Sequence, residues 1–281
     1  MTTVTIAHLS DLHFGRDVDL EQVDALEILI AGLKPSAVVI AGDLTQRARH
    51  GELQRALAFV QALRRTAPTL VIPGNHDVEW WKSPLGVLGA APRHRKYRSY
   101  FGADLSPRME IPGAVIASAL TSHGVAFASM TWNLNDLAVK GHLPAAEAAK
   151  VVRCFQAAPP GLARIVVVHH NVLRGAISRR MGLARWRTAQ RGLAATGADL
   201  ILCGHDHQEG AGQVDGVVVV ATASAHTRGR IRGGRASAFN VVTVEAASIS
   251  VQHLRWERET RRFVPSDLAR FGRVRSDGGD Q

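Results

Sequence analysis

Residues 4–13 read V-T-I-A-H-L-S-D-L-H and combine the two features that decide the fold. The first is a short apolar run rich in β-branched residues, which predicts a strand over Thr3–Leu9. The second is a pair of polar side chains, Asp11 and His13, that follow this strand directly. The same combination of a buried strand and metal-ligand side chains recurs at four further places in the chain.

Each of these four further strands runs into a short loop with Asp, Asn or His side chains. The loops contain Asp43; Asn75, His76 and Asp77; His169 and His170; and His205 with His207. In an open α/β sheet the carboxyl ends of neighbouring strands share one edge, so residues far apart in sequence meet there. Glycines at three of these turns (Gly42, Gly74 and Gly204) permit tight backbone bends.

Every loop also has a structural interpretation of its own. Asp43 could cap a helix, and Asn75–Asp77 after Pro-Gly could form an ordinary turn. A histidine pair at a strand end is often structural. The G-H-D-H segment is harder to explain in this way, because H-x-H directly after an apolar strand is a common metal-binding arrangement. Recurrence at five strand ends favours one joint metal site.

Strands and helices alternate along the first two thirds of the chain, which predicts a largely parallel sheet with helices on its faces. From Gln213 onward, successive strands imply antiparallel pairing. We therefore expect an α/β fold with a mixed sheet pair flanked by helices. Helices are expected at Leu20–Leu33, Gly51–Arg65, Pro144–Ala157 and Trp186–Thr196, and strands at Thr3–Leu9, Ala37–Ala41, Thr69–Ile72, Ala114–Ala117, Val125–Ser129, Ile165–Val168, Leu200–Cys203, Val217–Ala221, Ala238–Val244 and Ile249–Trp256.

The length of 281 residues suits one large domain. We expect this domain at residues 1–256, with an inserted basic segment around 84–106. A basic polar tail is expected at 257–281, with a disordered end. The start of the chain lacks the pattern of a secretory signal, and Cys154 and Cys203 form no CxxC pair, so we expect a cytoplasmic protein without a disulfide framework.

Carboxylate, imidazole and amide side chains without thiolates suit manganese, iron, zinc or cobalt. The seven candidate ligands exceed what one tetrahedral ion takes, so two ions that share a carboxylate are expected. Two such ions, about 3.5–4 Å apart, can hold a bridging hydroxide and clamp a phosphoryl oxygen. The chemistry predicted from the residues is therefore hydrolysis of a phosphate ester.

The blocks S-D-L-H, A-G-D-L-T, P-G-N-H-D, H-H and G-H-D-H run in this order from Ser10 to His207. They resemble the calcineurin-like metallophosphoesterase family, most closely its branch of bacterial cyclic-nucleotide phosphodiesterases. The resemblance implies a four-layer α/β/β/α sandwich of two facing mixed sheets flanked by helices. One departure is Asn171, which stands where this branch usually has proline.

The resemblance also implies roles for individual residues. His76 would contact the phosphate and protonate the leaving oxygen, and Asp77 would orient either His76 or its loop. The choice of His169 over His170 as a ligand is left open. One metal would be held by Asp11, His13, Asp43 and His207, and the second by Asp43, Asn75, His169 and His205, with Asp43 as the bridge.

The net charge of +10 attracts anions. Two groups of arginines follow candidate site strands, and we expect His170, Arg174 and Arg228 to bind substrate; a purely solvated basic face is the alternative. The segment R-H-R-K-Y-R-S-Y-F contains Tyr97 and Phe101 at helical spacing. It is interpreted as an amphipathic helix that closes over the core, with a lipid-binding or base-stacking helix as the alternative.

The leading functional hypothesis is a phosphodiesterase that acts on a small anionic substrate such as a cyclic nucleotide. The alternative substrates are nucleic acid or a phospholipid head group, reached through the basic insert and tail. A non-catalytic metal-binding scaffold is the third hypothesis, and the intact His76 argues against it. The sequence does not predict an oligomeric state.

Overall fold

The computed structural model describes residues 2–15, 18–79, 93–123, 140–222, 225 and 236–273. The helices in this part are α1 (Leu20–Leu33), α2 (His50–Thr66), α3 (Arg95–Phe101), α4 (Ala145–Ala157) and α5 (Trp186–Ala194). The strands are β1 (Val4–Leu9), β2 (Ala37–Ile40), β3 (Thr69–Val71), β4 (Arg108–Ile111), β5 (Ala114–Ser118), β6 (Ala163–Val167), β7 (Leu200–Cys203), β8 (Gly210–Val214), β9 (Val217–Ala221), β10 (Ala238–Val244), β11 (Ser248–Glu257) and β12 (Arg262–Gly272).

The strands form two sheets of six. The first sheet has the order β12-β11-β10-β1-β2-β3, and the second has the order β4-β5-β6-β7-β9-β8. In the first sheet β1, β2 and β3 are parallel, and β10, β11 and β12 are added in antiparallel pairs. In the second sheet β5, β6, β7 and β9 are parallel, with β4 and β8 antiparallel at the edges. Both sheets are therefore mixed, as expected from the sequence.

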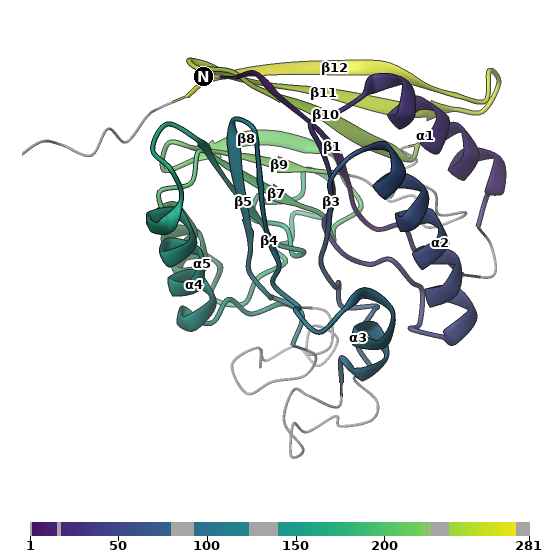
Figure 1. Cartoon of the computed structure of the whole chain (residues 1–281), viewed down its shortest axis with the longest axis horizontal. Helices are drawn as coiled ribbons and strands as arrows, with labels where there is room; N and C mark the ends of the chain where they lie inside the picture. Colours follow the sequence, from purple (N-terminus) through teal and green to yellow (C-terminus); the bar gives the residue numbers. More distant parts are fainter. Residues whose placement is uncertain are drawn as a thin grey trace, which may run out of the picture.

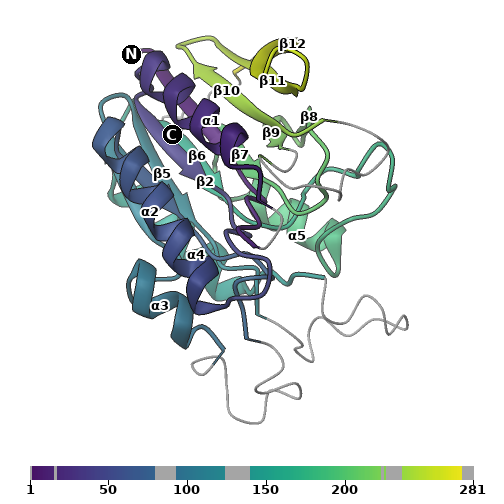
Figure 2. The same ribbon diagram turned by 90° about the vertical axis from the view of Figure 1, so that its right-hand side faces the viewer.

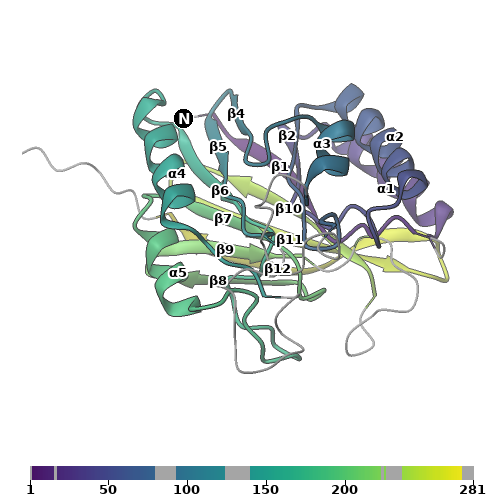
Figure 3. The same cartoon turned by 90° about the horizontal axis from the view of Figure 1, so that it is seen from below.

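Alternate residues of the central strands pack in different layers of the hydrophobic core. On β1, Ile6 belongs to the cluster between the sheets, whereas Ala7 packs beneath α1 and α2. On β6, Ile165 lies between the sheets and Val166 packs beneath α4 and α5. Strands buried on both faces are apolar throughout, which explains the continuous hydrophobic runs in the sequence. The result is the expected four-layer α/β/β/α sandwich (Figures 1 and 3).

Helices α1 and α2 run side by side over the outer face of the first sheet (Figure 2). Helix α1 begins after Asp19, whose carboxylate accepts a hydrogen bond from the Gln22 N–H at 3.4 Å. Its inner face buries Leu26 and Ile30, while Ile28 points outward. Within the described ranges, no helix combines the length and apolar character needed to cross a membrane.

The inserted basic segment contains α3, which packs as an amphipathic helix. Tyr97 is buried and its ring lies 4.9 Å from that of Phe101, and both join the core beneath α1 and α2. Lys96 reaches back to Glu79, with 3.1 Å between Nζ and Oε1. These contacts favour the core-closing interpretation for Arg95–Phe101. Residues 84–92 of the insert, and the strand expected at Val125–Ser129, lie outside the described residues.

The prediction of a polar tail from residue 257 is wrong for Arg262–Gly272. These residues form β12, which pairs with β11 along most of its length. The boundary expected at residue 256 therefore cuts through a hairpin. As an edge strand, β12 carries exposed charges and Pro265, features that limit further pairing and hide the strand pattern in the sequence.

We predict that Phe263→Ala destabilises the protein by about 3 kcal/mol, because Phe263 anchors β12 to the core. Its ring is 7% exposed and lies 5.3 Å from Phe239 and 5.2 Å from Trp256. The free energy of unfolding in urea measures this loss. The control is Leu268→Ala on the same strand, where the side chain is 54% exposed and the change should stay below about 0.5 kcal/mol. Equal losses would contradict the anchoring role.

Candidate metal centre

The five loops that carry the candidate ligands meet at one end of the two sheets. Within the first sheet, the Asp11 N–H donates to the Gly42 carbonyl and the His13 N–H donates to the Asp43 carbonyl, both at 2.9 Å. Across the sheets, the His205 N–H donates to Asp11 Oδ2 at 2.9 Å. The convergence expected from the strand ends is therefore present, and it includes both sheets.

The backbone at this end is strained. A non-glycine residue with positive φ is uncommon, and such residues concentrate at functional sites. Five of the seven candidate ligands have left-handed backbone conformations: Asp11 (φ 56°), His13 (φ 47°), Asp43 (φ 51°), His205 (φ 76°) and His207 (φ 54°). The fold therefore holds these five ligands in a backbone conformation that non-glycine residues rarely adopt.

The first cluster consists of Asp11, His13, Asp43 and His207, whose ligand atoms all lie within 4.8 Å of one another. His13 Nε2 is 2.9 Å from His207 Nε2 and 3.7 Å from Asp43 Oδ2. His207 Nε2 is 3.4 Å from Asp11 Oδ1. Two imidazole nitrogens thus face each other beside two carboxylates.

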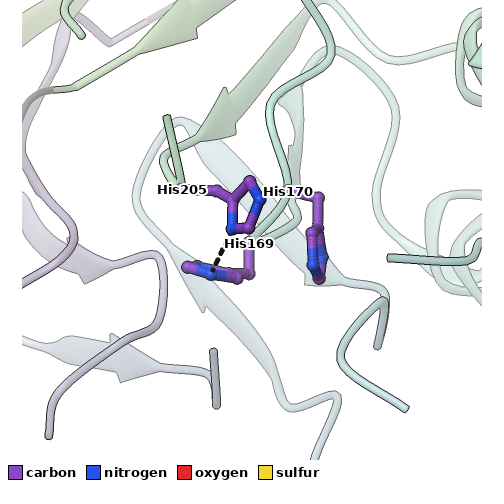
Figure 4. Close-up of side chains that lie close together, drawn as sticks. All are labelled: His169, His170 and His205. Atoms are coloured by element: carbon purple, nitrogen blue, oxygen red, sulfur yellow. Dashed lines mark hydrogen bonds between the residues drawn. The ribbon is translucent and has the colours of Figure 1, made fainter. Parts of the chain in front are cut away.

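The second cluster contains Asn75, His169 and His205. Asn75 Oδ1 lies 3.0 Å from His169 Nε2 and 2.9 Å from His205 Nδ1. The two imidazole nitrogens are 3.3 Å apart, as the dashed line in Figure 4 shows. An amide oxygen and two ring nitrogens therefore point at a common position.

Asp43 lies between the two clusters. Its Oδ2 faces His13, and its Oδ1 lies 3.4 Å from His169 Nε2. Gly74 packs against this carboxylate so closely that a Cβ there would collide with it. One buried side chain thus presents one oxygen to each cluster, which is the arrangement of a bridging ligand.

The paired histidines after β6 have different surroundings. His169 Nε2 faces Asn75 and Asp43, whereas His170 Nδ1 is hydrogen-bonded to Thr121 Oγ1 at 2.8 Å. The His170 ring still packs against His205, with 4.4 Å between ring centroids (Figure 4). The atom that faces Asp43 therefore belongs to His169.

Burial and neighbouring charges set the protonation states of these groups. Burial lowers the pKa of His13 to about 3 and that of His205 well below its usual value. Burial also raises the pKa of Asp43, but the neighbouring His169 and His76 outweigh this effect and hold that pKa well below its usual range. Conversely, burial lowers the pKa of His169, yet Asp43 raises it to about 9 overall. The ionised carboxylate of Asp43 thus faces the neutral imidazole of His13 on one side and the protonated imidazole of His169 on the other.

The donor geometry fits a bound cation. Ligand atoms bonded to a common ion at about 2.1 Å lie about 3.0–3.4 Å from one another. The separations between the ligand atoms described above run from 2.9 to 3.7 Å. The neutral imidazoles of His13 and His205 and the ionised carboxylate of Asp43 are in the protonation states that bind metals, whereas His169 would release a proton when a cation binds.

The family model described as calcineurin-like phosphoesterase matches residues 4–209. The chain belongs to this family. The match runs from β1 to the loop after β7 and so covers both clusters.

Two curated relatives match about a third of the chain. A glycerophosphodiester phosphodiesterase from Enterobacter lignolyticus is 35% identical over 108 residues, which cover 33% of this chain and 38% of that protein. A transmembrane protein with a metallophosphoesterase domain from Bos taurus is 32% identical over 101 residues, which cover 34% of this chain and 22% of that protein. The chain therefore matches well under half the length of these relatives.

Two solved structures share the fold at low sequence identity. The purple acid phosphatase PPD1 from yellow lupin (Lupinus luteus) has a TM-score of 0.68 and 11% identity over 96% of this chain and 54% of that chain. PhoD has a TM-score of 0.68 and 10% identity over 97% of this chain and 70% of that chain. In both cases the structural match covers nearly the whole chain, beyond the residues that the family model matches.

His76, from the calcineurin-like P-G-N-H-D block, lies at the rim of the first cluster and is partly exposed. Its N–H donates to Asp43 Oδ1 at 2.8 Å, and its ring stands edge-on to His13 with 4.7 Å between centroids. Ring Nδ1 lies 2.8 Å from the Gln46 carbonyl, so this nitrogen carries the hydrogen and Nε2 remains available. Gln46 could not be identified from the sequence, because its backbone carbonyl rather than its side chain makes the contact.

Asp77, grouped with His76 as a candidate catalytic residue because it would orient His76 or its loop, directs its carboxylate to the loops and not to the His76 ring. Its buried carboxylate accepts hydrogen bonds from the N–H groups of Leu44, Thr45 and Gly74 at 2.9–3.0 Å. The Thr45 hydroxyl donates a fourth bond at 2.7 Å. Asp77 thus joins the loops after β2 and β3, which is the second of the two roles considered for it.

Of the three residues expected to bind substrate, the structure describes His170 and Arg174. His170 is buried and bonded to Thr121. Arg174 is exposed, and no hydrogen bond or ion pair joins its side chain to a described residue. Arg228 lies outside the described residues. The prediction that these three residues bind substrate therefore stays a prediction.

We predict that Asp77→Ala lowers the free energy of unfolding by about 3 kcal/mol or more, because it leaves buried donors of two loops without an acceptor. Chemical denaturation measures the loss. His76→Ala is the matched control from the same loop, since the partly exposed ring takes part in one hydrogen bond and should cost about 1 kcal/mol. A stability loss for His76→Ala as large as that for Asp77→Ala would contradict the loop-joining role.

Proposed function

We propose that the chain is a metal-dependent phosphodiesterase with two cations held by the two clusters. The observation that carries this proposal is the position of Asp43, which offers one carboxylate oxygen to each cluster. A pair of cations that share a carboxylate is the arrangement used by many phosphoester hydrolases.

The first cation would be held by Asp11, His13, Asp43 and His207, and the second by Asp43, Asn75, His169 and His205. Oxygen and imidazole ligands without thiolates suit manganese, iron, zinc or cobalt. When bound, such ions lower the pKa of a coordinated water and neutralise charge on a phosphoryl oxygen.

The side chains of the protein would orient the substrate and move the proton. His76 has its Nδ1 hydrogen directed to the Gln46 carbonyl, so Nε2 is the atom that can contact a phosphate. An imidazole can carry a proton near neutral pH, and His76 would deliver it from Nε2 to the leaving oxygen. Asp77 would keep the loop of His76 against that of Asp43, and so fix the distance between the proton donor and the cations.

The proposed substrate is a small phosphodiester, with a cyclic nucleotide as the first candidate. The partial similarity to a glycerophosphodiester phosphodiesterase supports diesters over monoesters and makes glycerophosphodiesters the second candidate. Nucleic acid and phospholipid head groups remain the alternative substrates. The cytoplasmic location expected from the sequence stays a prediction.

We predict that the protein loaded with manganese or zinc binds about two ions per chain. Asn75→Ala should remove the second ion alone, and His207→Ala should weaken the first alone, whereas Asp43→Ala should impair both because it is shared. Elemental analysis after gel filtration measures the stoichiometry, and circular dichroism checks the fold. If Asn75→Ala and His207→Ala each retain the full metal content, the ligand assignment is wrong.

We also predict that the metal-loaded protein hydrolyses small phosphodiesters faster than the matching monoesters. A panel of cyclic nucleotides, glycerophosphodiesters, monoesters, oligonucleotides and phospholipids measures kcat/KM with each of the four metals. His76→Ala should lower kcat by about 10²–10⁴-fold without loss of metal. Full metal loading without turnover of any ester would favour the non-catalytic scaffold.

A further inference from the structure

A group of exposed arginines follows the ligand His169 in the chain, in the loop after β6 and along α5. It consists of Arg174, Arg179, Arg180, Arg185, Arg187 and Arg191, here called the arginine surface, and all six side chains are exposed. The sequence from 171 to 198 contains no acidic residue. In the described part of the chain, none of the six forms an ion pair. Their charge is therefore available to an external anion.

The loop that carries three of these arginines is folded rather than extended. Asn171, at the position where the family branch usually has proline, donates from Nδ2 to the carbonyls of Leu173 at 2.8 Å and Arg180 at 3.2 Å. The Gly175 N–H also donates to the Arg180 carbonyl at 3.1 Å. These bonds close the loop on itself and present Arg179 and Arg180 at its surface.

This loop is joined to the ligand-bearing turn after β7. The Ser178 hydroxyl donates to Asp206 Oδ2 at 2.5 Å, and the Ile177 N–H donates to Gln208 Oε1 at 2.7 Å. Asp206 stands between His205 and His207, and its Oδ2 also accepts from Gln208 Nε2 at 2.7 Å. The part of the arginine surface on this loop, which includes Arg179 and Arg180, is thus held next to the turn that carries His205 and His207.

Apolar side chains are interspersed with the arginines. Ile177 is 43% exposed and lies in sequence between Arg174 and Arg179. Trp186 is partly exposed, and the Arg187 guanidinium lies 4.2 Å from its ring centroid. An exposed aliphatic side chain and a tryptophan among cations are typical of surfaces that enter the lipid head-group region. Because Arg187 covers one face of Trp186, that face is not open to a stacked base.

We propose that the arginine surface docks the protein on an anionic phospholipid bilayer, with Ile177 entering the head-group region and the candidate metal centre held close to the membrane. This docking goes beyond the proposed phosphodiesterase function and does not depend on it. Charge complementarity supplies long-range attraction, and the apolar side chains add a contact that salt does not screen.

The test is co-sedimentation of the full chain with vesicles of phosphatidylcholine alone or mixed with phosphatidylglycerol. Binding should require phosphatidylglycerol and weaken with added salt. Arg179→Gln/Arg180→Gln should lower the partition coefficient roughly 30-fold. The matched control is Arg64→Gln/Arg65→Gln, which removes the same charge at the end of α2, the end of the fold opposite to the ligand loops, and should change binding much less.

Ile177→Ser should weaken vesicle binding at unchanged net charge, most clearly at high salt, where screening leaves the apolar contact. Equal effects of the two double variants would overturn the proposal, since they would show a response to net charge alone. Absence of binding to anionic vesicles would also overturn it, as would preferential binding to an added oligonucleotide. Vesicle binding by His76→Ala separates this test from the proposed activity, because docking should survive the loss of catalysis.

Discussion

The buried carboxylate of Asp43 is the constraint on which the site depends. A charge removed from water is tolerated only where neighbours compensate for it. Here the compensation comes from His13 on one side and His169 on the other, with a backbone N–H from His76. Gly74, which has no Cβ, lets its loop approach the Asp43 carboxylate closely. The left-handed backbone of Asp43 is the second feature of this close packing.

The positions of the ligands could be predicted because the direction of parallel strands determines which loops lie at the same edge of a sheet. Once the apolar runs are assigned to neighbouring parallel strands, the residues after them must share an edge. The choice between His169 and His170 could not be predicted in the same way. It depends on which ring faces Asn75 and which faces Thr121, and Thr121 belongs to none of the recognised blocks.

Two features escaped sequence reasoning for different physical reasons. β12 is an edge strand, so only Phe263 is well buried and the alternation of apolar and polar residues is faint. The family resemblance left open whether Asp77 orients His76 or its loop, and the answer depends on hydrogen bonds to Leu44 and Thr45, more than 30 residues earlier in the chain. Neither the pairing of an edge strand nor the joining of two distant loops produces a recognisable pattern in the local sequence.

The candidate centre spans the boundary between the two sheets, since Asp11 and Asp43 follow strands of one sheet and His169 and His207 follow strands of the other. A cation shared by these side chains would act as a cross-link between the two halves of the sandwich. Its binding energy would then contribute to keeping the halves together, because a separated pair of sheets cannot offer the complete ligand set. Folding and metal loading would then be linked equilibria, so that a bound cation raises the free energy of unfolding.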